Sequence, residues 1–430
     1  MIGPADRRTG PASGPLDRQA IAGVIGNVLE WYDFAVFGYF APIIGRQFFP
    51  SDDHVASLLN AFGVFAAGYL MRPLGGVIFG SIGDRLGRKR ALQLSIAMMA
   101  LPTTLLGLLP THAQIGVAAP VLLVLLRLIQ GVSVGGELIG SVSFVTENAP
   151  PHRRGLLGSF SFASSTGGIL LGSAVATLLG EIMEPANLYA WGWRIAFLVG
   201  FLVGGVGLWM RRSLRETADF ARAREAGELA RNPVREALRT MPGRILHLAA
   251  LIVVVGGVFY LLFVWWPTYL THIITPPVPH AMLANTLCMV ALFILIPVGG
   301  WLSDLIGRRT VLVAAMGGIA LVAYPLFVWT DQGTFGPALV AQLIFTILMG
   351  GAVGPIPAAM MEMFPTRTRF SAVAVGYNVT LALFGGTAPL ICTWLATRTG
   401  DLAAPAYYLI AMTLVSLAAA LAWAPAHTAG

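Results

Sequence analysis

The sequence is poor in charge and in cysteine. Only 11% of its 430 residues are Asp, Glu, Lys or Arg, while 56% are hydrophobic and 50 are glycine. A water-soluble domain needs about twice this charge to cover its surface, so this composition excludes an ordinary soluble protein. The two cysteines, Cys288 and Cys392, both lie in apolar stretches. They exclude a disulfide scaffold, and we assign them no role.

The sequence also lacks the motifs that carry enzyme chemistry. It contains no phosphate-binding GxxxxGK[ST] loop, no nucleophile elbow and no zinc signature. The net charge of +7 is not gathered into a basic patch with interleaved aromatic residues, which argues against nucleic acid as a partner. We therefore predict that the protein is not an enzyme, has no metal site, and needs no cofactor beyond a coupling ion.

Long hydrophobic runs dominate what is present. A bilayer core requires about 20 apolar residues per helix, and the backbone must be hydrogen-bonded within each span. The sequence predicts an all-α membrane protein with twelve spans, near residues 20–44, 56–82, 91–110, 117–146, 156–180, 193–211, 245–274, 283–303, 311–330, 336–362, 371–397 and 405–424.

A single long polar segment divides the chain into two six-helix halves. We predict a cytoplasmic tail over 1–19, bundles over 20–211 and 245–424, a central loop over 212–244 and a tail over 425–430. The first residues show no cleavable signal pattern. With the amino terminus inside, cytoplasmic segments hold 22 of the 27 Lys and Arg residues, as the positive-inside rule requires. Both termini are therefore expected in the cytoplasm, with the protein in the cell's inner (plasma) membrane.

The two halves repeat one another. GSIGDRLGRKR at 80–90 returns as GWLSDLIGRRT at 300–310, and the order Glu, Pro, Arg at 147–154 returns at 362–369. The offsets are nearly equal, 220 and 215 positions. Parallel repeats of this kind predict a substrate path between two pseudo-symmetric bundles that rock against each other.

These repeated loops resemble the signature of the major facilitator superfamily, and the resemblance implies that fold. Acidic residues do little for topology, so Asp84 and Asp304 are expected to act in gating. Carboxylates and arginines at helix ends can pair and close the inner side while the outer side is open. The residues assigned to this gate are Asp84, Arg85, Arg88, Glu137, Glu147, Arg154, Asp304, Arg308, Glu362 and Arg369.

A narrower resemblance is carried by six segments. They are GNVLEWYDF (26–34), MRPLGG (71–76), RLIQGVSVGGE (127–137), WGWR (191–194), MFPTRTRFSA (363–372) and YNVTLALFGGTAP (377–389). Together they resemble the metabolite:proton symporter family, whose members carry citrate, 2-oxoglutarate, shikimate, or proline and betaine. The resemblance implies uptake of a small polar metabolite driven by protons, without naming the metabolite.

Charges inside the membrane are few and point to function. Glu30 and Asp33 lie three residues apart on one face of the first helix, near the midplane. We predict that Asp33, or second Glu30, carries the coupling proton; the alternative is that either one neutralises a buried arginine. Arg127, with Gln130 on the same face, is expected to hold a substrate carboxylate, or else to form an ion pair with Glu30, Asp33 or Glu137. Glu137 has a second option, a pair with Arg72.

Neutral groups complete the predicted site. Tyr32, with the neighbouring aromatic residues Trp31 and Phe34, could meet a quaternary amine. Tyr377 and Asn378 could hydrogen-bond the substrate from the second half, although helix contacts are the commoner role of such residues.

The function predicted is a proton-coupled symporter, active as a monomer, that imports a small organic acid. A net positive site around Arg127 favours a di- or tricarboxylate. The alternatives are a zwitterionic osmolyte such as proline or betaine, or proton-coupled export by the same superfamily fold; a facilitator and a sensor are further rivals.

Overall fold

The computed structural model describes residues 18–86, 88–134, 137–212 and 233–423, and the regular structure in these ranges is helical. Ten of the described helical segments are long and apolar enough to cross a membrane. The helices α1 (Arg18–Tyr39) and α5 (Arg88–Leu108) occupy the other two predicted positions. The prediction of a twelve-helix membrane fold is thereby confirmed.

The N-terminal half contains six spanning positions. Its elements after α1 are α2 (Ala41–Phe48), α3 (His54–Leu70), α4 (Arg72–Leu86), α5, α6 (His112–Ile115), α7 (Ala118–Ser133), α8 (Glu137–Asn148), η1 (Pro151–Arg153), α9 (Arg154–Ile182), α10 (Pro185–Asn187), η2 (Leu188–Gly192) and α11 (Trp193–Arg212). The first predicted span is wrong at its end, because α1 stops at Tyr39 and α2 is a separate helix with proline in its first turn.

The C-terminal half repeats this arrangement. Its elements are α13 (Pro233–Thr240), α14 (Pro242–Leu251), η3 (Val254–Val258), η4 (Leu261–Trp265), α15 (Trp266–His272), α16 (Ala281–Ile306), α17 (Arg308–Thr330), α18 (Phe335–Val353), α19 (Ile356–Glu362), α20 (Thr366–Thr380), η5 (Leu381–Gly385), α21 (Ala388–Arg398) and α22 (Ala404–Ala422).

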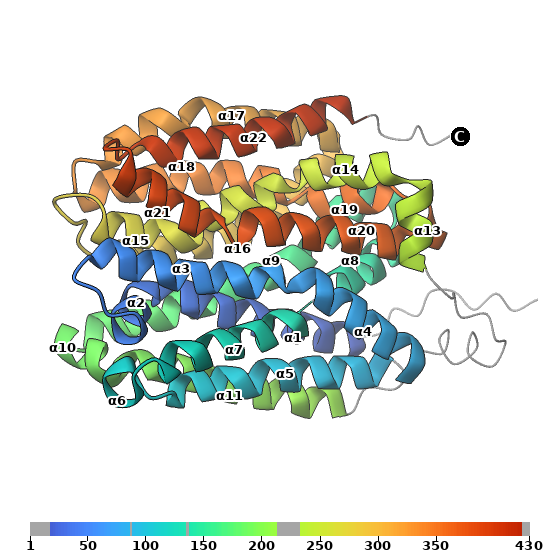
Figure 1. Ribbon diagram of the computed structural model, residues 1–430. Helices are drawn as coiled ribbons and strands as arrows, with labels where there is room; N and C mark the ends of the chain where they lie inside the picture. The colour runs from blue at the N-terminus through green and yellow to red at the C-terminus, as the bar shows by residue number, and fades with distance from the viewer. Residues whose placement is uncertain (1–17, 87, 135–136, 213–232, 424–430) are drawn as a thin grey trace, which may run out of the picture.

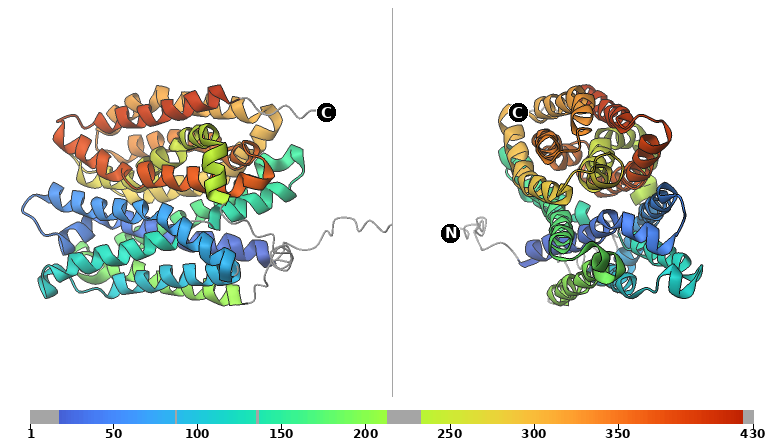
Figure 2. Two further views of the ribbon diagram at one scale, coloured as in Figure 1. Left: turned by 45° about the vertical axis from the view of Figure 1, so that its right-hand side comes forward. Right: turned by 90° about the vertical axis from the view of Figure 1, so that its left-hand side faces the viewer.

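The halves lie side by side as two helical bundles. Figure 1 shows the C-terminal bundle above the N-terminal one, with their helices running in roughly the same direction. The end-on view in Figure 2 separates the two bundles. Helices α9 and α16 form the main contact between them, and α3 packs against α21 on another part of the interface. The predicted path between the halves therefore lies along this interface.

π-helical turns interrupt the regular helices at several places. The seventh span contains two, η3 and η4, the eleventh contains η5, and η2 precedes α11. Such turns are frequent at functional sites. Proline by itself does not end the helices, because α16 continues through Pro297 and α17 through Pro325. A proline does accompany the break between α18 and α19, at Pro355, and the break between α1 and α2.

A glycine makes the tight turn of the repeated loop in the second half. Gly307 separates α16 from α17 with a φ of 92°, a conformation that residues with a Cβ rarely adopt. The turn directs Asp304 at the end of α16 and Arg308 at the start of α17 toward the same region.

Candidate functional site

Helix α1 places two carboxylates in the interior of the N-terminal bundle. It packs along α9 and also contacts α11, so its middle is surrounded by protein. Glu30 and Asp33 are 7% and 2% exposed. A charge buried this deeply is stable only when it is paired and hydrogen-bonded.

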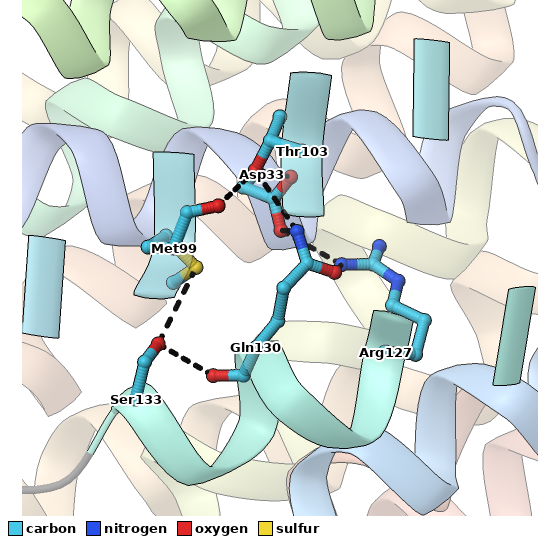
Figure 3. A network of polar contacts seen from close by, with 6 residues as sticks. All are labelled: Asp33, Met99, Thr103, Arg127, Gln130 and Ser133. Atoms are coloured by element: carbon cyan, nitrogen blue, oxygen red, sulfur yellow. Dashed lines mark hydrogen bonds and ion pairs between the residues drawn. The ribbon is translucent and has the colours of Figure 1, made fainter. Parts of the chain in front are cut away.

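Asp33 is held by three donors from two neighbouring helices. Its Oδ2 accepts hydrogen bonds from Arg127 Nη1 at 2.7 Å and from Gln130 Nε2 at 2.9 Å. Its Oδ1 accepts one from the hydroxyl of Thr103 at 2.7 Å. Figure 3 shows Arg127 and Gln130 rising together from α7 toward Asp33. The ion pair predicted as one alternative for Arg127 is therefore present.

Arg127 is fully buried, with its guanidinium carbon 3.9 Å from the centre of the Phe37 ring. Its Nη1 also donates to Gln130 Oε1 at 2.9 Å, so the i, i+3 pair acts as one unit. This arrangement leaves Arg127 neutralised by Asp33. The expectation of a net positive site around Arg127 is wrong for this reason.

Glu30 pairs with a different arginine. Its Oε1 lies 3.2 Å from Nη2 of Arg72, which begins α4 and is 2% exposed. The alternative that paired Arg72 with Glu137 is not tested, because the side chain of Glu137 lies outside the described residues. From the sequence, Arg72 was expected only as a possible partner of Glu137. Nothing in the local sequence indicates that residues 30 and 72 lie together.

Arg72 faces aromatic rings at the interface between the bundles. Its guanidinium carbon lies 5.2 Å from the ring centres of both Trp31 and Tyr69. Its Nε and Nη1 are buried and have no hydrogen-bond partner among the described residues. The hydroxyl of Tyr69 is hydrogen-bonded to that of Tyr260 in the other half. Arg72 therefore has donors to offer at a place where the two halves meet.

The other predicted substrate residues lie in different surroundings. Tyr32 donates its hydroxyl to the carbonyl of Ala196 on α11 at 2.6 Å, so it points into its own bundle and not toward the partner bundle. Tyr377 is buried, with its ring 6.1 Å from that of Phe162 across the interface. Asn378 donates to the carbonyl of Ala374 one turn back, the helix contact that was the alternative for it.

A cluster of neutral polar residues joins α1 and α9 of the first half to α16 and α18 of the second. Asn285 on α16 donates to the hydroxyls of Tyr39 and Ser173, at 3.3 and 3.1 Å, and accepts from Gln342 at 2.6 Å. Tyr39 donates in turn to the carbonyl of Phe263 at 2.9 Å. The sequence alone did not single out Tyr39, Ser173 or Gln342, because polar residues of this type are common helix contacts.

The predicted gate residues of the second half meet the first half. Asp304 accepts hydrogen bonds from the backbone amides of Gly155 and Leu156, at 2.9 and 2.8 Å, at the start of α9. A carboxylate at a helix N-terminus also interacts favourably with the helix dipole. Arg308 lies 3.2 Å from Asp304 and 2.9 Å from Glu362.

An ion pair also joins the two halves. Arg369 Nη1 lies 3.0 Å from Glu147 Oε1. In the internal repeat, Glu147 corresponds to Glu362 and Arg369 corresponds to Arg154. Arg154 begins α9 next to the Asp304 contact. The side chains of Asp84, Arg85 and Arg88 lie outside the described residues, so their assignment to the gate stays a prediction.

The sequence of this chain is similar to that of known proteins. Residues 23–376 match the family model of the Major Facilitator Superfamily. The chain belongs to this superfamily. It is a multi-pass membrane transporter and not an enzyme.

Curated relatives from the same superfamily align with nearly the whole of this chain. A proline/betaine transporter of Salmonella typhimurium is 34% identical over 418 residues, which span 94% of this chain and 82% of the relative. A glycine betaine/proline/ectoine/pipecolic acid transporter of Dickeya dadantii is 33% identical over 416 residues, with the same coverage. A putative proline/betaine transporter of Staphylococcus aureus is 34% identical over 405 residues, which span 93% of this chain and 86% of the relative.

Solved structures support the fold. The crystal structure of a D-xylose-proton symporter superposes with a TM-score of 0.72 at 19% identity, covering 94% of this chain and 96% of that one. An inward open conformation of the xylose transporter XylE from E. coli gives a TM-score of 0.71 at 16% identity, with 94% of both chains covered. At this identity the likeness establishes the architecture alone.

Proposed function

We propose that this transporter is a proton-coupled symporter that imports a zwitterionic osmolyte of the proline or betaine type. The observation that carries the proposal is the charge balance of the buried site: two carboxylates on α1 are each paired with an arginine, Glu30 with Arg72 and Asp33 with Arg127. A neutral site has no excess charge with which to compensate a di- or tricarboxylate, because burying unpaired charge is costly. The curated relatives support the same substrate class by their names.

The substrate carboxylate is proposed to bind Arg72. Its Nε and Nη1 are buried donors with no hydrogen-bond partner among the described residues, and each can donate a charge-assisted hydrogen bond to a carboxylate. The positive end of the substrate would lie against aromatic faces near this arginine, provided by Trp31 and Tyr69 from the first half and Tyr260 from the second. Since Tyr69 and Tyr260 come from opposite halves, a substrate between them would be sensed by both bundles.

Asp33 is proposed to carry the coupling proton. Arg127 stays charged while the carboxylate titrates, so protonation of Asp33 would change the net charge of the site by one unit. Such a change of buried charge can alter the relative free energies of the two orientations of the bundles, so that the protonated and the unprotonated protein favour different ones. We further propose that the protein lies in the plasma membrane with its amino terminus in the cytoplasm, as the distribution of Lys and Arg favours.

The test is uptake into liposomes with and without an inside-alkaline pH gradient. Labelled proline, betaine, citrate and 2-oxoglutarate are compared for the unaltered protein, for Asp33→Asn, and for Asp331→Asn as a control at an exposed loop position. We expect gradient-driven accumulation of proline or betaine, its loss in Asp33→Asn, and normal accumulation in the control.

Three results would contradict the proposal, each in a different way. Accumulation of citrate in place of the zwitterions would restore the organic acid as substrate. Uptake that ignores the gradient would indicate a facilitator. Accumulation that survives in Asp33→Asn would move the proton site to another residue.

A further inference from the structure

A water-sized cavity lies behind Asp33, on the side away from the partner bundle. Every residue that lines it belongs to the N-terminal half, from α1, α5, α7 with the adjoining Val134, and α11. The space open to the centre of a water molecule is about 20 Å³. One ordered water needs roughly 10–15 Å³ by this measure, so the cavity has room for one water.

The lining of this cavity includes polar residues that could hydrogen-bond a water. Both carboxylates of α1, Glu30 and Asp33, border it, together with the side chains of Thr103, Ser95 and Ser133. The two serine hydroxyls already donate to the carbonyls of Ser133 and Gln130, at 2.8 and 2.6 Å, which leaves their oxygens able to accept. A water in this position has the two to four polar partners that make a buried water stable.

Thr103 connects Asp33 to the cavity. Its hydroxyl lies 2.7 Å from Asp33 Oδ1 and 2.8 Å from the carbonyl of Met99, and it accepts from Gln130 Nε2 at 2.9 Å (Figure 3). A hydroxyl has one proton, so it can donate to only one of the two acceptors at a time. It donates to Asp33 when that carboxylate is ionised, and it can turn away and accept from Asp33 when the carboxyl is protonated.

We propose that Thr103 and one water in this cavity form a proton relay between Asp33 and Glu30, inside the N-terminal bundle. The proposal rests on the role of Asp33 in the proposed function. The O–H bond at Asp33 Oδ1 breaks as its proton passes to Thr103 Oγ1. The hydroxyl proton of Thr103 passes to the water, and the water gives a proton to the Glu30 carboxylate. Thr103 and the water end unchanged, with the proton moved from Asp33 to Glu30.

The position of Glu30 gives the relay a direction. Three residues of helix correspond to about 4.5 Å along its axis, so Glu30 lies nearer than Asp33 to the amino-terminal end of α1. With that end in the cytoplasm, the relay carries the proton inward. The relay meets the proposed substrate site at its end, where Glu30 pairs with Arg72.

The experiment separates net transport from exchange. Gradient-driven uptake requires the proton to be released, whereas exchange of labelled for unlabelled proline at equal pH lets the proton stay on the carrier. We expect Thr103→Val, which keeps the shape of the side chain and removes the hydroxyl, to slow net uptake by about tenfold or more, in line with the loss of a proton-transfer group. Exchange should stay within about twofold of the unaltered protein, and Thr103→Ser should recover net uptake.

Thr104→Val is the matched control, since Thr104 is the neighbouring threonine on α5 and donates only to the carbonyl of Ala100. It should leave both activities unchanged. A second variant, Ala100→Leu, fills the cavity without touching an ionisable group and should also slow net uptake more than exchange. Equal loss of uptake and exchange in Thr103→Val, or normal net uptake in Ala100→Leu, would overturn the relay. Failure of the proposed function is distinct, because Asp33→Asn would then keep gradient-driven accumulation.

Discussion

The side chains that matter most in this protein are charged groups buried away from bulk solvent. Arg127 and Asp33 are 0% and 2% exposed, so each depends on the other for its charge to be tolerated. Breaking such a buried pair from one side leaves an uncompensated charge, which costs about 3–5 kcal/mol. At the residue scale, stability and function are therefore built on the same atoms.

This dependence predicts how the pair responds to substitution. Arg127→Met should lower the free energy of unfolding by about 3 kcal/mol or more, because Asp33 loses its counter-charge. The double variant Arg127→Met with Asp33→Asn should recover much of that loss. Unfolding of the purified protein in detergent measures both. A double variant as unstable as the single one would show that Arg127 stabilises through packing on Phe37 instead.

Arg72 supports a second prediction at this scale. Arg72→Lys keeps the charge that faces Glu30 but loses the fixed planar set of donors proposed to meet the substrate carboxylate. We expect KM for proline to rise about tenfold, which is the loss of about one charge-assisted hydrogen bond, with kcat much less changed. The control is Arg194→Lys, because Arg194 stacks on Trp193 and is not part of the proposed substrate site. An unchanged KM in Arg72→Lys would remove Arg72 from the substrate site.

At the scale of elements, small residues set how closely the helices of the site approach. A Cβ on Gly131 of α7 would collide with the carbonyl of Gly68 on α3, and one on Gly75 of α4 would collide with the carbonyl of Val132. Close backbone approach of this kind is the usual role of glycine at membrane helix contacts. The approach matters here because α7 carries both Arg127 and Gln130.

This packing predicts that the effect of a glycine-to-alanine substitution depends on the position of the glycine. Gly131→Ala should force α3 and α7 apart, lowering stability by about 1–3 kcal/mol as overpacked sites do, and weakening proton-coupled uptake by displacing Gln130. Gly63→Ala on α3 should be harmless, because its Cβ would meet open space. Unfolding and uptake of both variants test this, and a tolerated Gly131→Ala would mean that α3 has room to move.

At the scale of the whole molecule, contacts between the halves are present at both ends of the interface. Asp304 and the pair Glu147–Arg369 hold one end. At the other end Arg398 lies 3.4 Å from Asp53, and His280 lies 2.7 Å from Glu181. The structure is therefore held by contacts between the halves at both ends of the interface.

Removing the contacts at one end should open that end. We expect Asp304→Ala, which loses two hydrogen bonds to the start of α9, to raise the labelling rate of a cysteine at the buried Ser159 by about tenfold, a shift worth about 1.4 kcal/mol between open and closed states. The measurement uses a maleimide applied to inside-out vesicles, with Cys288 and Cys392 replaced by serine. Asp331→Ala is the control, and equal labelling in both would mean that Asp304 does not hold the gate.

What the sequence determined by itself follows from local chemistry. Hydrophobic length requires the spanning helices, and the repeat of Asp304 and Arg308 after Asp84 and Arg88 requires two related halves. The superfamily, and a zwitterion as one alternative substrate, were within reach of the same residues. Glu30, Asp33, Arg127 and Gln130 stood out because ionisable and polar groups are rare inside membrane helices.

Only the tertiary structure decided how these groups combine. The pairs Glu30–Arg72 and Asp33–Arg127 join residues 42 and 94 positions apart, and Thr103 reaches Asp33 across 70. No local pattern specifies which carboxylate meets which arginine, because that choice depends on how α1, α4, α5 and α7 pack. The packing changed a site expected to be positive into a neutral one, and it placed a threonine that looked ordinary in the sequence between the proposed proton carrier and a water-sized cavity.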